Sequence, residues 1–185
     1  MLKKNWKTLL ITSLIMLIPM VMGLLLWAKL PDPMPSHWDI NGNVDGWSSK
    51  PFAVFGLPGL LLGIHWLCVL ASQADPKHKN YNAKMFALVL WICPVLSIVL
   101  NTLAFATALG MEVRIEIILP LLLGVTFVII GNLLPKCTQT YTMGIKLPWT
   151  LASEENWNKT HRFAGKVWVI GGVLIMATAL LGSFC

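Results

Sequence analysis

Five long runs of apolar side chains constrain this chain more than any other feature of its sequence. Each run meets or nearly meets the roughly 20 helical residues needed to cross a hydrocarbon core about 30 Å thick. Because lipid offers backbone groups no hydrogen-bond partners, such segments must be helical. The sequence therefore predicts an all-α, polytopic integral membrane helix bundle with about five transmembrane helices. The predicted spans are Thr8 to Ala28, Phe52 to Ala71, Met85 to Leu109, Ile115 to Leu134 and Val167 to Phe184.

Composition supports the same class. Hydrophobic residues make up 56% of the 185 residues and charged residues only 12%, whereas a soluble domain has about 25% charged residues. The first run follows Lys3, Lys4 and Lys7, as a signal peptide would. It is too long for one, lacks a small-residue cleavage site and precedes four further spans, so we expect a retained helix.

The basic residues predict the orientation of the chain. Cytoplasmic segments of membrane proteins are enriched in lysine and arginine, and placing the N-terminus inside puts 11 of the 14 basic residues on the inner side. The net charge of +6 is therefore explained by topology, and we expect no direct binding of nucleic acid. The inner residues are Lys3, Lys4, Lys7, Lys77, Lys79, Lys84, Lys136, Lys146, Lys159, Arg162 and Lys166.

The outer segment from Pro31 to Pro51 is predicted to form a small hairpin cap. Short alternating stretches flank Asn41-Gly42, a pair typical of hairpin turns. Trp38 and Trp47 are expected either to pack on each other or to enter the membrane interface. His37, Asp39 and Asp45 suggest two alternatives, an outer cation site or hydrogen bonds that fix the turn. Their mixed, irregular spacing favours the hydrogen bonds, so no metal or cofactor is expected.

Two polar residues fall inside predicted spans. His65 is a candidate functional residue because ionisable groups are costly within the membrane. The alternative is a neutral imidazole that bonds to a neighbouring helix. Asn101 is expected to join helices by hydrogen bonding rather than to bind a ligand. The basic loop from Asp75 to Asn80 is expected to set topology and to contact anionic lipid headgroups.

The longest polar segment runs from Gly131 to Lys166 and is placed on the inner side by the basic residues. A helix is predicted to start at Thr150 or Ser153, with Ser153 as its cap and two glutamates near the positive end of its dipole. This helix should lie along the cytoplasmic membrane surface and turn near Gly165 into the last span. Its shared face is formed by Trp157, Thr160, His161, Ala164 and Trp168.

Two stretches carry family resemblances. Pro35-x-His37-Trp38, Gly42, Asp45-Gly46-Trp47 and Lys50-Pro51 resemble DUF1648, a small two-helix bacterial membrane domain. Gly131-Asn132-x-Leu134-Pro135-Lys136, Gly144-Ile145-Lys146-x-Pro148-Trp149-Thr150-Leu151 and Trp157-x-x-Thr160-His161-Arg162, with Gly165, resemble the SdpI family. The resemblances suggest a division into residues 1–72, with the outer loop 31–51, and residues 73–185, with the inner motif loop 131–166.

The SdpI resemblance implies a multi-pass protein of the bacterial cytoplasmic membrane that protects the cell from a membrane-active peptide toxin. The family is named after the Bacillus immunity protein against the sporulation-delaying toxin, which also retains a transcriptional repressor at the membrane. The family usually has Arg-Thr where this chain has Lys146-Leu147, so a bidentate guanidinium contact is replaced by a point charge. The founding member also has a sixth span, which suggests that this chain is a shortened relative or a fragment.

Membrane lipids, a peptide toxin and a repressor at the cytoplasmic face are therefore the expected partners. Two other function classes stay open. A membrane enzyme would use His161 with Glu154, Thr160 and Lys146, although no nucleophile or metal-binding motif accompanies them. A small transporter would use His65 and Asn101. The candidate toxin- or partner-binding residues are Asn132, Gly144, Lys146, Pro148, Trp149, Thr150, Trp157, Thr160, His161, Arg162, His37, Trp38, Asp45 and Trp47.

Overall fold

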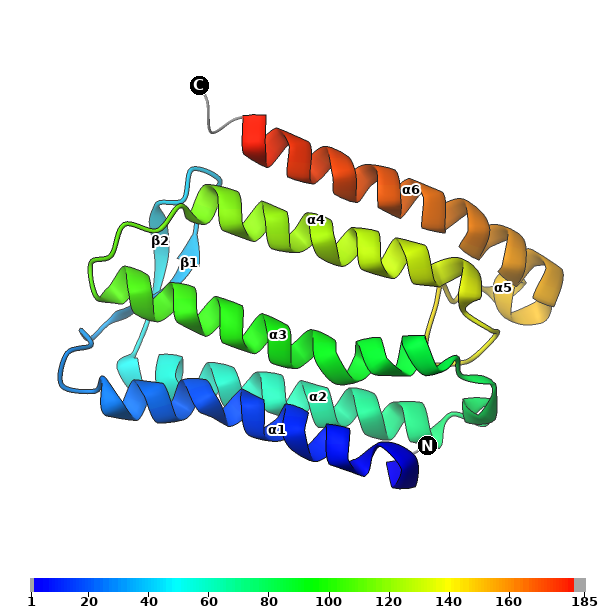
Figure 1. Cartoon of the computed structure of the whole chain (residues 1–185), viewed down its shortest axis with the longest axis horizontal. Helices are drawn as coiled ribbons and strands as arrows, with labels where there is room; N and C mark the ends of the chain where they lie inside the picture. Colours follow the sequence, from blue (N-terminus) through cyan, green and yellow to red (C-terminus); the bar gives the residue numbers. More distant parts are fainter. Residues whose placement is uncertain (1, 182–185) are drawn as a thin grey trace. The chain divides into compact units, whose positions relative to one another are not determined.

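The computed structural model describes residues 2–181 and confirms the helical membrane architecture (Figure 1). Among these residues, five helices are long and apolar enough to cross a membrane. The last three residues of the predicted fifth span, 182–184, lie outside the described part of the chain. The five long helices are α1 Leu2–Leu25, α2 Leu57–Ala74, α3 Ala83–Ala108, α4 Ile115–Leu133 and α6 Glu154–Leu181.

Shorter elements connect these helices. The strands β1 and β2 form an antiparallel pair, which confirms the predicted hairpin. A π-helical turn leads into α2, and single 3-10 turns follow α2 and α4. The short elements are β1 Met34–Trp38, β2 Val44–Ser48, η1 Phe52–Gly56, η2 His78–Asn80, η3 Leu134–Lys136 and α5 Pro148–Ala152.

The chain forms two compact units. The first contains the described part of Met1–Leu70 together with Leu88–Ile115, and therefore holds α1, the hairpin, most of α2 and most of α3. The second contains Ala71–Ala87 and the described part of Glu116–Cys185, and therefore holds the inner loop between α2 and α3 with α4, α5 and α6. The division near residue 72 that the sequence suggests stays a prediction.

The hairpin of the first unit is anchored on α1 by Lys50. Its Nζ donates to the carbonyls of Trp27 and Leu30, at 3.2 and 2.8 Å, just beyond the end of α1. Carbonyls at a helix C-terminus lack intrahelical partners and carry partial negative charge, so a lysine stabilises them. Gly46 is required opposite His37, because an added Cβ would lie 2.7 Å from the His37 Cβ.

His65 joins two helices of the first unit, as the interhelical alternative expects. Its Nε2 lies 3.2 Å from Thr12 Oγ1, and that hydroxyl donates to Leu9 O at 3.0 Å. The hydroxyl proton is thereby engaged, so Nε2 must be the donor to Thr12. The prediction that Asn101 forms a hydrogen bond between helices is wrong. Asn101 Nδ2 donates to Ser97 O of the same helix at 2.8 Å.

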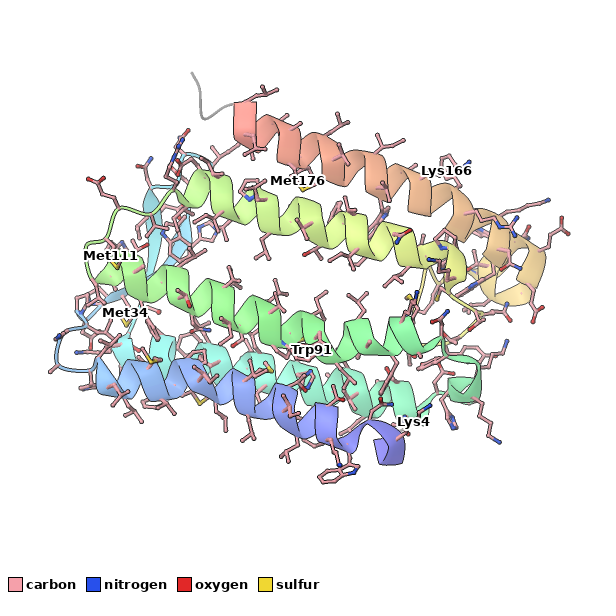
Figure 2. The ribbon with its side chains drawn as sticks, in the orientation of Figure 1. Lys4, Met34, Trp91, Met111, Lys166 and Met176 are labelled. Atoms are coloured by element: carbon pink, nitrogen blue, oxygen red, sulfur yellow. The ribbon has the colours of Figure 1, made fainter. Side chains whose placement is uncertain are left out.

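In the second unit, α4 and α6 run side by side and pack through glycines (Figure 1). A Cβ added at Gly165 would lie 2.7 Å from Gly131 O, and one added at Gly172 would lie 2.6 Å from Gly124 O. Near one of these contacts, Met176 extends from α6 toward α4 (Figure 2). Small residues at such positions let the backbones of membrane helices approach closely.

The predicted turn near Gly165 is wrong. Helix α6 continues without a break through 28 residues, from Glu154 to Leu181. At 1.5 Å per residue it is about 42 Å long, which exceeds a hydrocarbon core of about 30 Å. Gly165 is a packing residue against α4 rather than a hinge, and α6 is long enough for its polar first turns to lie outside the lipid core.

Candidate functional site

The inner motif loop folds around the first turns of α6. Trp157 and His161, one helical turn apart, are both 1% exposed, and their rings stack with centroids 4.1 Å apart. Gly144, at φ +104°, lies against both rings. A Cβ there would approach His161 Nε2 to 2.5 Å and Trp157 to 2.7 Å. Only glycine provides both this backbone conformation and this space.

Both nitrogens of His161 are engaged by backbone groups. Nε2 accepts from Ile145 N–H at 2.9 Å, so the proton of a neutral ring resides on Nδ1. Nδ1 then donates to Trp157 O at 2.8 Å. The Trp157 indole donates in turn to Cys137 O at 2.7 Å. The imidazole therefore holds the Gly144–Ile145 segment of the loop against α6, and neither nitrogen is free for a substrate.

Thr150 fixes the approach to α6. Thr150 is fully buried. Its hydroxyl can donate to Ile145 O at 2.8 Å or to Leu147 O at 3.0 Å. The same Oγ1 accepts from Leu147 N at 2.9 Å. Ser153 caps α6 as predicted, since its Oγ accepts from Asn156 N at 3.3 Å.

The shared face predicted for this segment is also confirmed. Trp157, His161 and Ala164 are buried, while Lys159 and Arg162 point away from that face and are exposed. Further along α6, Trp168 stacks on Phe127 of α4 with centroids 4.8 Å apart.

Asp75 is the residue that sequence reasoning missed. It follows α2, is 2% exposed, and its carboxylate ties two loops of the second unit together. Oδ1 accepts from Lys77 N at 2.8 Å. Oδ2 accepts from Tyr141 N at 2.8 Å, and from Thr142 N, Thr142 Oγ1 and Tyr81 Oη, each at 2.9 Å. The Tyr81 and Thr142 hydroxyls also contact each other.

We call this hydrogen-bond network around the Asp75 carboxylate the Asp75 clamp, and its environment sets the protonation states of Asp75 and Tyr81. Burial disfavours the Asp75 carboxylate, but the hydrogen bonds from Lys77, Thr142, Tyr81 and Tyr141 outweigh it, and its pKa lies below the ordinary value of 3.8. Burial, together with the nearby carboxylate, raises the pKa of Tyr81 to about 12. Tyr81 therefore remains a hydroxyl donor and Asp75 an acceptor across the neutral range.

A second link joins the same two loops. Lys77 Nζ donates to Gln139 Oε1 at 2.5 Å and also lies 5.4 Å from the centroid of the Tyr141 ring. Gln139 Nε2 donates onward to the carbonyls of Thr150 and Leu151, each at 2.9 Å. Burial raises the pKa of the Cys137 thiol to about 11, so this cysteine is a protonated packing residue.

The remaining candidates of the inner loop are exposed to different extents. Gly144 and Thr160 are half-buried. Asn132 borders an open groove of about 340 Å³ that also includes Gly131, Gly165 and Lys166. The exposed inner candidates are Asn132, Lys146, Pro148, Trp149 and Arg162.

The outer candidates belong to the first unit and form the hairpin. His37 Nδ1 lies 2.5 Å from Asp45 Oδ1, and both side chains are exposed. Asp39 accepts from Asn43 Nδ2 at 3.1 Å and from the backbone N–H groups of Asn43 and Asn41 at 2.8 and 2.9 Å; these bonds lower its pKa and fix the loop. Of the two alternatives, these bonds support the turn-fixing one, and no group of three or more potential metal ligands occurs among residues 2–181.

The two hairpin tryptophans are placed differently. In the register, Trp38 pairs with Val44 and Trp47 with Pro35, so the two are not opposite each other. Trp38 is half-buried, whereas Trp47 is 57% exposed.

Comparison with known proteins confirms both resemblances. Residues 136–185 match the SdpI/YfhL protein family, and residues 14–62 match a domain of unknown function, DUF1648. The chain is 30% identical over 173 residues to "Immunity protein SdpI" of Bacillus subtilis (strain 168). The aligned region covers 94% of this chain and 80% of that relative. No solved structure matches the chain.

Proposed function

This chain belongs to the SdpI/YfhL protein family, and we propose that it is a membrane immunity protein that protects its cell from a membrane-active peptide toxin. The observation that carries the proposal is the similarity to an immunity protein along 94% of the chain. That similarity includes both the outer hairpin and the inner motif loop. The proposed partners are the toxin, the surrounding lipids and a repressor at the inner face.

The geometry of His161 favours binding over catalysis. An acid–base catalyst must present a ring nitrogen to the proton that it transfers. Here Nε2 is occupied by Ile145 N–H and Nδ1 by Trp157 O, and the side chain is 1% exposed. A transporter role for His65 is less well supported, because its Nε2 contacts Thr12 and joins α1 to α2. Both histidines instead stabilise the fold.

The proposed mechanism divides the work between the two polar segments. The orientation predicted from the basic residues places the hairpin outside, where an arriving toxin meets it first, and the inner loop in the cytoplasm. The hairpin and the helices would bind toxin, and the inner loop would report that event by retaining a repressor. Lys146, Trp149 and Arg162 are exposed on that loop and supply two cations and an aromatic ring for such a contact.

A survival assay tests the proposal. A Bacillus strain without its own immunity gene would express this chain and be challenged with the sporulation-delaying peptide toxin. Survival should rise to that given by the Bacillus relative at equal membrane abundance. The toxin and the lipid pool, followed by mass spectrometry, should stay chemically unchanged. Killing at the empty-vector rate would overturn the immunity function, and a modified toxin or lipid would replace it with an enzymatic one.

Two changes to the chain test whether the hairpin binds the toxin and the inner motif loop binds the repressor. Replacing residues 31–51 with the equivalent hairpin of a relative should move toxin specificity to that relative's toxin. Arg162→Gln should weaken the retention of the repressor at the membrane, measured with a transcriptional reporter for the gene that the repressor controls, while Lys159→Gln serves as a matched control. Lys159 is an exposed cation of the same helix that pairs with Glu155 at 2.6 Å. Specificity that follows the inner loop would contradict the division.

A further inference from the structure

A cavity of about 210 Å³ lies within the first unit, between the hairpin and helices α2 and α3. Its walls are almost entirely apolar and include Pro35, Leu57, Leu61, Leu100 and Ala104. An apolar cavity of about 150 Å³ is enough to hold a benzene molecule. This cavity is therefore large enough for one bulky apolar side chain.

Two polar groups at this cavity lack a full set of partners. Trp38 lines it, and the indole Nε1–H is buried without a hydrogen-bond partner. Asn101 also lines it and is 5% exposed. Within residues 2–181 its side chain makes one hydrogen bond, from Nδ2 to Ser97 O, which leaves Oδ1 available as an acceptor. Native proteins rarely leave a buried donor unmatched, so such a group indicates a missing partner.

We propose that this cavity receives one apolar residue of the peptide toxin, with a backbone carbonyl of the peptide accepting from Trp38 Nε1–H and a backbone N–H donating to Asn101 Oδ1. This inference rests on the proposed immunity function and specifies where the toxin binds. A peptide residue carries an apolar side chain, an acceptor and a donor together, and these complement the apolar walls, the Trp38 N–H and the Asn101 amide oxygen. A lipid acyl chain fits the apolar walls but matches neither polar group.

The inference also gives the two hairpin tryptophans different roles. Trp38 contacts the ligand within the cavity, whereas Trp47, paired with Pro35 in the register, stays exposed. Trp38→Phe keeps one aromatic ring and removes the N–H donor together with part of the indole volume. Trp91→Phe makes the same chemical change on α3, at a tryptophan that is 42% exposed and does not line the cavity, and is the matched control.

The test measures binding of the sporulation-delaying peptide toxin to the purified full chain in phospholipid nanodiscs. Loss of one hydrogen bond should weaken binding of Trp38→Phe about 3- to 10-fold, and Trp91→Phe should bind within about twofold of wild type. Ala104→Phe fills the cavity and should weaken binding at least about 10-fold. Thr102→Phe, at an exposed position two residues earlier in α3, is its control.

The outcomes separate this inference from the function on which it rests. If wild type neither binds the toxin nor protects cells, the immunity function fails. If wild type binds and protects while Trp38→Phe and Ala104→Phe do so equally well, the cavity is not the toxin site. A photoreactive leucine at position 61 provides an independent measurement. Crosslinks to the peptide support the inference, and crosslinks to phospholipid alone at saturating toxin overturn it.

Discussion

Asp75→Asn should destabilise the inner loops of the second unit more than any other carboxyl-to-amide change in the chain. The native carboxylate accepts five hydrogen bonds, one on Oδ1 and four on Oδ2. An amide oxygen in the place of Oδ2 keeps four donors but loses its charge, which is worth about 1 kcal/mol per bond. The amide NH₂ then faces the Lys77 N–H, so that two donors oppose each other at a cost of about 1–3 kcal/mol.

Because four donors share one oxygen, these losses do not add fully. We expect the free energy of unfolding to fall by about 3–5 kcal/mol, and Tm by roughly 10 °C. The assay is thermal unfolding in nanodiscs, followed by tryptophan fluorescence and by proteolysis of the inner loops. Glu155→Gln is the control, since its pair with Lys159 is exposed and contributes about 0.5 kcal/mol or less. If Asp75→Asn unfolds together with this control, the clamp does not stabilise the loops.

The same clamp predicts how stability depends on pH. The pKa of Asp75 is lower in the folded protein than its ordinary value of 3.8, so the unfolded chain binds the proton more tightly. The stability from Asp75 is therefore fully present above about pH 4 and is lost as the pH falls through the folded-state pKa. The difference in unfolding free energy between wild type and Asp75→Asn should narrow below about pH 4. A constant difference down to strong acid would contradict the assignment.

Three further substitutions test the glycines and the tryptophan of the inner loop, with Gly171→Ala, where an added Cβ meets open space, as their control. Gly144→Ala should abolish protection in the survival assay at normal abundance, because its φ of +104° and the 2.5 Å approach to an imidazole nitrogen exclude a side chain. Gly165→Ala should lower Tm, because its Cβ would lie 2.7 Å from an α4 carbonyl. Trp157→Phe removes the 2.7 Å bond to Cys137 O and should cost about 1–3 kcal/mol in thermal unfolding. Protection or stability equal to that of the control would refute each expectation.

Periodicity and composition were sufficient for the features that depend on neighbouring residues. The five spans follow from the lengths of the apolar runs, and the hairpin follows from the alternation around Asn41-Gly42. The buried face of α6 follows from residues spaced three and four apart. Each of these features depends only on residues within the same turn or the same helix.

Contacts between distant residues could not be predicted in this way. Asp75 accepts hydrogen bonds from Tyr141 and Thr142, which lie 66 and 67 positions later in the sequence. Its neighbouring lysines predict only a basic loop. Gly165 looked like a helix break because glycine is a poor helix former. Its role became visible only with Gly131 of α4 opposite it. In a single sequence, a packing glycine and a hinge glycine have the same signature.

Burial separates the motif residues of the inner loop into two groups with different meanings for function. Thr150, Trp157 and His161 are almost fully buried and bond to the loop backbone. Loss of protection after changing one of them would therefore show that the loop must fold, and would not show that the residue touches a partner. Lys146 and Arg162 are exposed, and a change there leaves the packing intact. A partner at the inner face must therefore bind through the exposed group, while the buried group holds that surface in place.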